Sequence, residues 1–192
     1  MIGPRGDGRF WDPHLETMSA PELRALVNER LRTQLAHIEA KSPFYGRLLG
    51  GEAHRLRRIR TTEDLRTLPF TDKEDLRQSL SDHPPLGDHL AVDIDKVVRV
   101  HSSSGTTGRP SYMGLTAADS AAWAEMTARC LYATGLRPVN RIVYAFNIGL
   151  FCGGPANLDA IQMIGAMLVT VGTGASDRLV NAIRVLGGDH LT

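Results

Sequence analysis

The sequence contains few of the features that mark secreted, membrane or nucleic-acid-binding proteins. Its 192 residues include two cysteines, which form no C-x-x-C pair, so neither a disulfide framework nor a zinc site is expected. The 22 Lys and Arg residues nearly balance the 21 Asp and Glu residues, and a net charge of +1 creates no field that would attract nucleic acid or a membrane surface. No apolar run approaches the roughly 20 residues that cross a bilayer. We therefore expect a soluble cytoplasmic protein whose partners are small molecules, with no nucleic acid and no membrane.

The first part of the chain carries the signals of helices. Ser19 and Glu22 have the spacing of a capping box, and apolar residues then recur at helical spacing as far as Ile38. A shorter helix is expected after Ser42-Pro43, and Thr71-Asp72-Lys73-Glu74 repeats the capping-box pattern for a third helix. This stretch therefore predicts a mainly helical segment.

Residues 81–88 form the predicted boundary of that segment. Pro84 and Pro85 lack the N–H donor that a helix needs, and Gly87 loosens the backbone. We therefore expect two parts, a mainly helical segment over residues 1–88 and a subdomain over residues 89–192.

The second part alternates short apolar strands with helices. We expect strands at residues 97–100, 112–115, 141–146 and 167–171. Helices are expected to begin near Thr116, Asn157 and Ser176, and the first of them carries an apolar side formed by Trp123, Met126, Cys130 and Leu131. This alternation predicts an α/β fold of βαβ units with a mainly parallel sheet. Because a further strand would begin at the last four residues, we expect the subdomain to be truncated at its C-terminus.

A loop rich in glycine and hydroxyl side chains separates the first two predicted strands, between His101 and Pro110. Glycine permits positive φ and close backbone approach, and successive N–H groups can converge on an anion. The spacing of the glycines does not match the P-loop of NTPases, and a polar loop without a ligand is the alternative. The pattern favours a cradle for phosphate oxygens, and its candidate ligand-binding residues are Ser103, Ser104, Gly105, Thr106, Thr107, Gly108 and Arg109.

The loop and its flanking segments resemble the phenylacetate-CoA ligase family of the adenylate-forming, AMP-binding enzyme superfamily. The loop is similar to the Ser/Thr-Ser-Gly-Thr-Thr-Gly-x-Pro motif of the superfamily. The family resemblance is carried by Phe10-Trp11-Asp12-Pro13, Ser42-Pro43-Phe44-Tyr45, Leu68-Pro69-Phe70-Thr71-Asp72-Lys73 and Gly149-Leu150-Phe151-Cys152-Gly153-Gly154. These segments occur in order over nearly the whole chain, so the resemblance implies the N-terminal portion of such an enzyme.

The resemblance implies a two-step reaction. A carboxylate attacks the α-phosphorus of ATP and releases pyrophosphate, and the thiol of coenzyme A then attacks the acyl-adenylate. It implies ATP, Mg²⁺ and coenzyme A as cofactors and a small aromatic carboxylic acid as substrate. The substrate-binding positions would be Phe146, Phe151, Gly153 and Gly154, while plain core positions are the alternative for the two phenylalanines.

The chain also departs from the family pattern beside these positions. Asn147 and Ile148 stand where the family usually has Gly-Tyr, and residues 155–159 replace a segment that usually contains His-Tyr. The identity of the acid is therefore open. Asp159 is a candidate for recognising an amino or hydroxyl group on it, with a helix-surface aspartate as the alternative.

The resemblance implies that the adenine and ribose contacts, the magnesium-binding glutamate and the catalytic lysine of the family lie downstream of this sequence. No catalytic residue and no metal ligand is therefore assigned, and the isolated chain is expected to be inactive. The alternatives are a catalytically silent nucleotide-binding remnant and an assembly or interaction module that needs a second chain. A homodimer and a complementing C-terminal chain are both compatible with the sequence.

A basic cluster lies outside these motifs. His54-Arg55-Leu56-Arg57-Arg58-Ile59-Arg60 carries four arginines in seven residues. It could contact phosphates of coenzyme A or of nucleic acid, or form a solvated surface. No aromatic residue is interleaved with the arginines to stack on bases.

Overall fold

The computed structural model describes residues 8–103, 110–150 and 152–192. The chain forms two compact units, one of residues 18–116 and the other of residues 1–17 together with residues 117–192. The expected boundary at residue 88 falls inside the first of these units. Leu86 is buried and lies against Gly114. The segment of residues 83–88 therefore packs on the strands that follow it.

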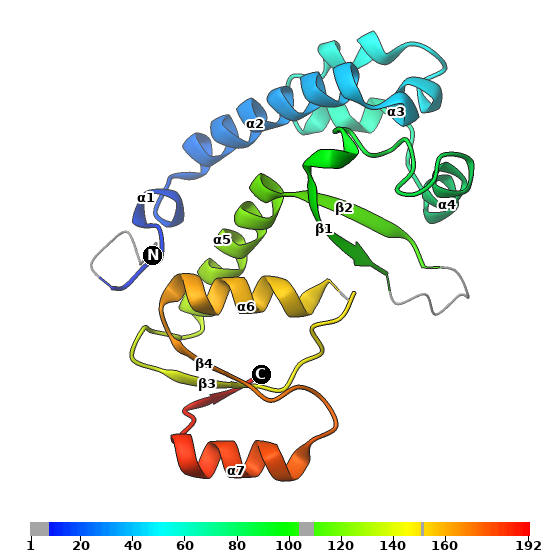
Figure 1. The fold of residues 1–192 in the computed structure, drawn as a ribbon. Coiled ribbons are helices and arrows are strands. Elements are labelled where there is room, and N and C mark those ends of the chain that lie inside the picture. Colours follow the sequence, from blue (N-terminus) through cyan, green and yellow to red (C-terminus); the bar gives the residue numbers. More distant parts are fainter. Residues whose placement is uncertain (1–7, 104–109, 151) are drawn as a thin grey trace. The chain divides into compact units, whose positions relative to one another are not determined.

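The unit of residues 18–116 begins with a long helix, α2 (Ala20–Lys41) (Figure 1). Its expected capping box is confirmed, because the backbone N–H of Ser19 donates to the Glu22 carboxylate at 2.9 Å. The apolar stripe is only partly covered: Leu35 is buried, whereas Leu23 and Val27 are exposed. Most of the stability of α2 therefore comes from its C-terminal half.

Shorter helices follow: α3 (Pro43–Leu48), η1 (Ala53–Arg58), η2 (Glu63–Thr67), α4 (Lys73–Asp82) and η3 (Ile94–Lys96). The cap of α4 lies one residue later than expected, since Asp72 accepts from the N–H groups of Glu74 and Asp75 in place of Thr71. A carboxylate is a good cap at the positive end of a helix. The core of these helices consists of Leu35, Leu49, Leu56 and Ile59.

The same unit contains a two-stranded sheet of β1 (Val97–Ser102) and β2 (Tyr112–Thr116). The strands are antiparallel, with His101 opposite Met113 and Ser102 opposite Tyr112. The prediction of a mainly parallel sheet is therefore wrong for this pair. The connection is too short for the crossover that a parallel pair needs, so the chain turns back on itself.

The other unit contains α1 (Pro13–Glu16), α5 (Ala117–Ala133), β3 (Arg141–Tyr144), α6 (Gly153–Ile164), β4 (Met167–Thr170), α7 (Ser176–Leu186) and β5 (His190–Leu191). Its sheet has the order β4-β3-β5, and both pairs are parallel. Here the α/β prediction is confirmed. Within this unit α6 lies on one side of the sheet and α7 on the other (Figure 1).

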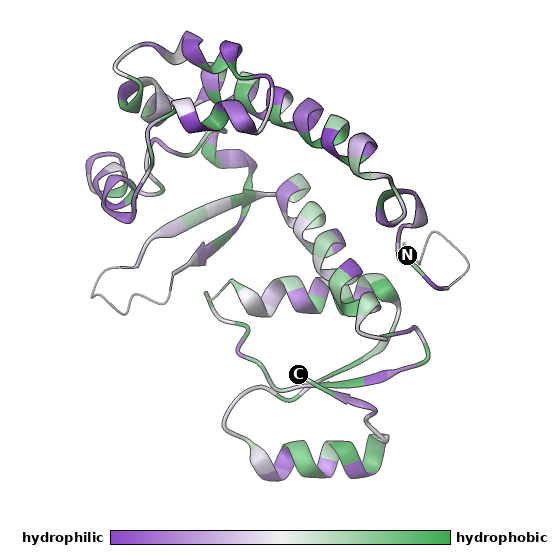
Figure 2. Ribbon diagram, turned by 180° about the vertical axis from the view of Figure 1, so that it is seen from behind, coloured by the Kyte–Doolittle hydropathy of each residue, from purple (hydrophilic) through white to green (hydrophobic). Residues whose placement is uncertain are grey.

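The core of this unit lies between α5, α6 and the sheet. Its buried residues include Trp11, Ala128, Tyr132, Tyr144 and Ile164. Figure 2 shows hydrophobic residues along α6, α7 and β3, and a mixture of hydrophilic and hydrophobic residues along α2 and the helices that follow it.

The buried face of α5 differs from the apolar side expected from the sequence. It is formed by Ala124, Ala128 and Tyr132, whereas Met126 and Cys130 are exposed. Small alanines let α5 approach its neighbour closely, which the larger side chains would prevent. None of the helices in the described ranges is long and apolar enough to cross a membrane.

Candidate functional site

The predicted phosphate loop connects β1 to β2. Its residues Ser104, Gly105, Thr106, Thr107, Gly108 and Arg109 lie outside the described residues. Its two ends are described. The backbone N–H of Ser103 donates to the carbonyl of Ser111 at 2.9 Å, and the N–H of Ser111 donates to Oγ of Ser103 at 2.9 Å. The loop is therefore held closed at its base by a side chain that itself belongs to the motif.

The two strands that flank the loop pack against other residues of the same unit. The Cα of Gly114 in β2 faces Leu86 and Val97, and a Cβ at this position would lie 3.0 Å from the Leu86 side chain and 3.1 Å from that of Val97. His101, next to the loop, is buried in β1. This packing fixes the two strands that flank the loop.

The predicted acid-binding residues lie in the other unit, where β3 ends and α6 begins. Phe146 follows β3 and keeps 38% of its surface exposed, so it is not part of the buried core. Its ring lies 6.3 Å from that of Tyr144, measured between centroids, at a tilt of 54°. Gly153 and Gly154 form the first turn of α6. Phe151 lies outside the described residues.

A buried hydrogen bond joins the end of β3 to the first turn of α6. The hydroxyl of Tyr144, which is fully buried, donates to the carbonyl oxygen of Gly154 at 2.8 Å. Burial raises the pKa of Tyr144, and a hydrogen bond with Asn157 opposes that shift. This hydrogen bond holds the first turn of α6 against the end of β3, two residues before Phe146. The sequence pattern did not single out Tyr144, because an aromatic residue at a strand end is also typical of plain core.

Gly154 permits a close approach that no other residue would allow. A Cβ on Gly154 would lie 2.1 Å from the carbonyl oxygen of Asn147 and 3.0 Å from Cα of Ile148. The first turn of α6 therefore packs directly on the backbone of the loop that follows β3. The helix begins at Gly153, earlier than the expected start at Asn157, because Pro155 is well tolerated in a first helical turn.

The loop between β3 and α6 exposes apolar side chains. Ile148 and Leu150 are more than half exposed, and Phe146 is partly exposed. Asn147 shapes this loop, since its Oδ1 accepts from the N–H of Gly149 at 2.8 Å. Asp159 lies on α6 and is half-buried. The loop thus presents apolar surface beside Phe146, where the family pattern has its Gly-Tyr pair.

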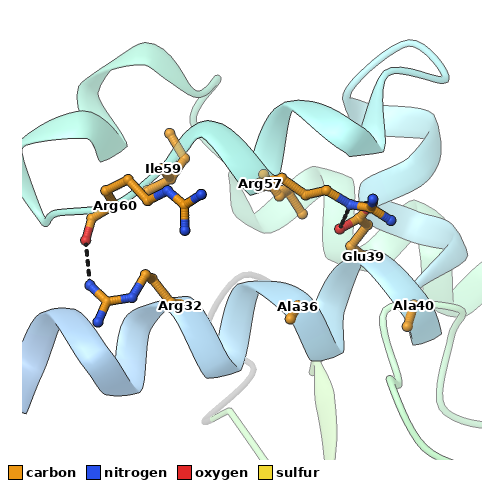
Figure 3. A pocket seen from close by; sticks show the side chains of 8 residues that line it. Arg32, Ala36, Glu39, Ala40, Arg57, Ile59 and Arg60 are labelled. Atoms are coloured by element: carbon orange, nitrogen blue, oxygen red, sulfur yellow. Dashed lines mark hydrogen bonds and ion pairs between the residues drawn. The ribbon is translucent and has the colours of Figure 1, made fainter.

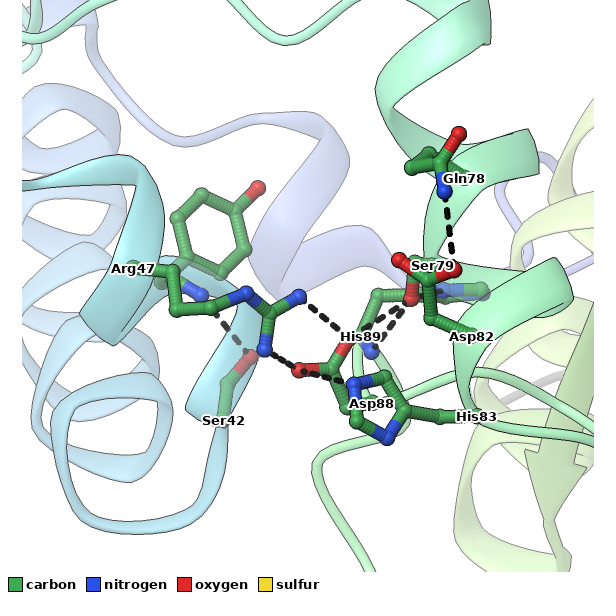
Figure 4. A network of polar contacts seen from close by, with 9 residues as sticks. Ser42, Arg47, Gln78, Ser79, Asp82, His83, Asp88 and His89 are labelled. Carbon is green, nitrogen blue, oxygen red and sulfur yellow. Dashed lines mark hydrogen bonds and ion pairs between the residues drawn. The ribbon is translucent and has the colours of Figure 1, made fainter.

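A second cluster of polar side chains lies in the unit of residues 18–116 (Figure 4). Asp88 accepts from the Arg47 guanidinium and, at 2.8 Å, from the hydroxyl of Ser79. The same hydroxyl lies 2.9 Å from Nδ1 of His89. The hydrogen bond from Arg47 lowers the pKa of Asp88 to about 2, with Ser79 adding to the shift and burial opposing it.

This cluster has the residue types of a serine hydrolase but not its geometry. In a catalytic triad the histidine lies between serine and carboxylate and takes the serine proton. Here Ser79 donates directly to Asp88, and Ser79 is only 2% exposed. Gly87 packs tightly beside it, as a Cβ there would lie 2.5 Å from the His89 ring. The cluster therefore ties the segment after α4 to α3 and α4.

Metal ligands are not gathered in the described part of the chain, where no three His, Cys, Asp or Glu side chains come together. Both Cys130 and Cys152 are free thiols.

No family profile matches the sequence, but the chain is similar to several known proteins of the same name. The chain is 41% identical over 175 residues to the phenylacetate-coenzyme A ligase of Thermus thermophilus, an alignment that covers 91% of this chain and 38% of that protein. It is 38% identical over 173 residues to the Escherichia coli enzyme of the same name, with 90% and 38% covered. The chain thus spans about two fifths of the length of the curated relatives it matches.

Solved structures give the same result. A structure of 2-hydroxyisobutyryl-CoA ligase in complex with 2-HIB-AMP and CoA, in the thioesterification state, matches with a TM-score of 0.89 at 31% identity. The match covers all of this chain and 41% of that one. An open conformation of the same ligase gives a TM-score of 0.88 at 29% identity, over all of this chain and 44% of the other. The resemblance that the motifs predict is therefore confirmed: over about nine tenths of its length the chain is similar in sequence to part of the phenylacetate-CoA ligases, and its fold is similar to part of 2-hydroxyisobutyryl-CoA ligase.

Proposed function

We propose that the chain is part of an ATP-dependent acid-CoA ligase, in which it supplies the phosphate-binding loop and part of the acid-binding surface. The observation that carries the proposal is the closed base of the loop. Two hydrogen bonds between Ser103 and Ser111 hold a Ser/Gly/Thr loop at the end of a packed hairpin. The curated relatives named above are CoA ligases, and the solved relative binds an acyl-AMP and CoA.

In this proposal the loop binds the terminal phosphates of ATP. Backbone N–H groups and the hydroxyls of Thr106 and Thr107 donate to phosphate oxygens, and Arg109 adds a fixed positive charge. A loop whose ends are already fixed loses less conformational entropy when it binds its ligand. The anchoring by Ser103 therefore supports affinity as well as orientation.

The acid is proposed to lie against Phe146 and Phe151, beside the first turn of α6. The ring of Phe146 has an exposed face, and a ring contact with an aromatic acid contributes about 0.5–1.5 kcal/mol beyond the area buried. Gly153 carries no side chain, so a substrate can approach the backbone there, whereas Gly154 lets the loop after β3 pack directly on the first turn of α6 beside the acid. Tyr144 acts as a positioning residue, because its hydroxyl holds the carbonyl of Gly154.

These residues bind and orient, and none of them takes part in covalent chemistry. In phosphoryl and adenylyl transfer the barrier is lowered mainly by positioning and by neutralising phosphate charge. Mg²⁺ would supply part of that neutralisation through the ATP phosphates, and no protein ligand for it is assigned among the residues of this chain. We propose that the chain forms no acyl-adenylate by itself.

Calorimetric titration with ATP–Mg²⁺ tests the proposal. We expect binding to the chain of 192 residues, and a loss of affinity in Thr106→Ala and Thr107→Ala of about tenfold or more, because a hydrogen bond to a charged group contributes roughly 1.5–3 kcal/mol. Thr33→Ala is the matched control, since Thr33 is exposed on α2. Absence of binding to the unsubstituted chain, or equal affinity in all the variants, refutes the phosphate loop.

A pyrophosphate-exchange assay tests the incompleteness of the site. With ATP, Mg²⁺ and a series of aromatic acids, the isolated chain is expected to show no exchange above background. Turnover that disappears in Thr106→Ala would show instead that the chain contains a complete adenylating site.

A further inference from the structure

A groove lies between α2 and η1 in the unit of residues 18–116 (Figure 3). We call it the α2–η1 groove, and it encloses a volume of about 520 Å³. This size is typical of a small-molecule site, for which the usual range is roughly 300–1,000 Å³. Its lining residues come from α2, from η1 and from the two positions after η1: Arg32, Ala36, Glu39, Ala40, Leu56, Arg57, Ile59 and Arg60.

The shape of the groove is set by the packing beneath it. Ala36 and Ala40 lie one turn apart on α2, and their small side chains leave the space open. Leu56 and Ile59 form the base, and both are almost fully buried, with exposed fractions of 2% and 4%. They belong to the core cluster that includes Leu35. The groove is therefore part of the folded framework of this unit.

The charged side chains divide into a paired end and an unpaired end (Figure 3). At one end, Nε of Arg57 donates to both carboxylate oxygens of Glu39, at 2.7 and 2.9 Å. This contact raises the pKa of Arg57. The positive charge of Arg57 is thus balanced within the groove itself.

At the other end are Arg32 and Arg60, and neither forms an ion pair with a carboxylate that the structure describes. Nη1 of Arg32 donates to the carbonyl oxygen of Arg60 at 3.2 Å, and the N–H of Arg60 donates to Asp64 at 2.9 Å. The backbone of Arg60 is therefore held from both sides. Its guanidinium makes no hydrogen bond or ion pair with any residue that the structure describes.

The groove consequently carries two positive charges that its own carboxylate does not balance. A bound anion would supply the negative charge that balances them. A guanidinium presents a planar fork of N–H donors that fits the oxygens of a phosphate. A phosphate group near neutral pH brings close to two negative charges, which matches the two uncompensated arginines.

We propose that the α2–η1 groove is a second anion site, in which Arg32 and Arg60 bind a phosphate group of a small-molecule ligand. The paired Arg57 and Glu39 close the opposite end of the groove. None of the lining residues is aromatic, so the groove offers no surface on which the bases of a single-stranded nucleic acid would stack. The site is separate from the phosphate loop and does not depend on the proposed ligase function.

Binding is measured by NMR on the ¹⁵N-labelled chain of 192 residues, with the Arg side-chain Nε–H resonances as the readout. The probes are inorganic phosphate and pyrophosphate at millimolar concentration and constant ionic strength. We expect saturable shifts of the Arg32 and Arg60 resonances, with pyrophosphate binding more tightly. In Arg32→Gln and Arg60→Gln the affinity falls by about tenfold, the loss typical of one charge-assisted hydrogen bond to phosphate.

Arg30→Gln is the matched control, because Arg30 is exposed on the same helix and does not line the groove. Its affinity for pyrophosphate is expected to stay within about twofold, the size of a screened long-range effect. The double variant Thr106→Ala with Thr107→Ala removes the phosphate loop as an alternative site, and the shifts of Arg32 and Arg60 persist in it. This double variant shows whether phosphate binding in the groove is independent of phosphate binding by the loop.

Three results would overturn the proposal. The first is the absence of saturable shifts at Arg32 and Arg60. The second is an equal loss of affinity in Arg30→Gln, which would indicate a diffuse basic surface. The third is a short oligonucleotide or an acidic peptide of equal charge that binds the groove more tightly than pyrophosphate, which would indicate a macromolecular partner.

Discussion

Replacing Gly154 with alanine tests how the acid-binding end of the sheet is built. The added Cβ would lie 2.1 Å from the carbonyl oxygen of Asn147, whereas ordinary van der Waals contact begins at 3.4 Å. The obstacle is backbone, so no side-chain rotation relieves it. The first turn of α6 must move away from the loop, and the hydrogen bond from Tyr144 to the Gly154 carbonyl is stretched or lost.

The cost is the sum of three effects. Overpacking a tight site costs roughly 1–3 kcal/mol, and loss of a buried hydrogen bond adds about 1 kcal/mol. The better helix propensity of alanine returns at most about 1 kcal/mol. We therefore expect Gly154→Ala to lower the free energy of unfolding by about 1–3 kcal/mol, which for a chain of this length lowers Tm by roughly 2–12 °C.

Urea unfolding followed by tryptophan fluorescence measures this loss in the correct unit. The chain has two tryptophans, and both Trp11 and Trp123 belong to the unit that contains Gly154. Gly149→Ala is the matched control in the same loop. Its Cβ would meet only the Asn147 side chain, at 3.2 Å, which can move. We expect that variant to stay within about 1 kcal/mol of the unsubstituted chain.

Equal stability of Gly154→Ala and the unsubstituted chain is the result that would rule out this close approach. It would mean that the first turn of α6 does not rest on the backbone of Asn147, and the position assigned to Phe146 would lose its support. A loss of stability that is the same in Gly149→Ala would also contradict it, because the effect would then not depend on the close approach.

Two further predictions concern side chains whose environment the structure defines. Arg47 lowers the pKa of Asp88 to about 2, so ionised Asp88 stabilises the fold above about pH 4, and this contribution of roughly 1–2 kcal/mol is lost as the pH falls toward 2. Urea unfolding followed by circular dichroism should show this loss of stability in the unsubstituted chain and not in Asp88→Asn. The same pH dependence in both proteins would contradict it. Phe146→Ala is expected to weaken binding of an aromatic acid by about two- to tenfold in a titration with ATP present. Because Phe146 is 38% exposed, the free energy of unfolding should change little. Unaltered affinity for the acid would mean that the acid binds elsewhere.

The sequence predicted the elements that depend on local signals. Ser19 with Glu22 marked the start of α2, and Gly165 and Gly187 end α6 and α7 in the left-handed conformation. Capping residues and glycines act within a few positions along the chain, so their effect can be judged without the fold.

Features that depend on distant residues were missed. The antiparallel pairing of β1 with β2 is set by the short connection and by packing on Leu86, which periodicity does not report. The buried side of α5 was assigned to large apolar residues, whereas alanines and Tyr132 form it, because close packing against α6 selects small side chains.

The candidate site divides in the same way. The glycine and hydroxyl residues of the loop were predicted from their pattern, and Phe146 was predicted from the resemblance to the family; both stay predictions. The hydrogen bond between Tyr144 and Gly154 joins positions ten residues apart through the fold, and no local pattern indicates it. The role proposed for the basic cluster also depends on the fold, since Arg32 of α2 lines the same groove as Arg60 and contacts its backbone.

Binding of nucleotide phosphates by the loop between β1 and β2 can be measured by paramagnetic broadening with Mn²⁺–ATP in the ¹⁵N-labelled chain, because broadening falls off steeply with distance from the metal. We expect the strongest broadening at the amides of Ser103 and Ser111, with less at the far ends of both strands. Sharp Ser103 and Ser111 resonances at saturating Mn²⁺–ATP, with broadening confined to Arg57 and Arg60, would contradict it.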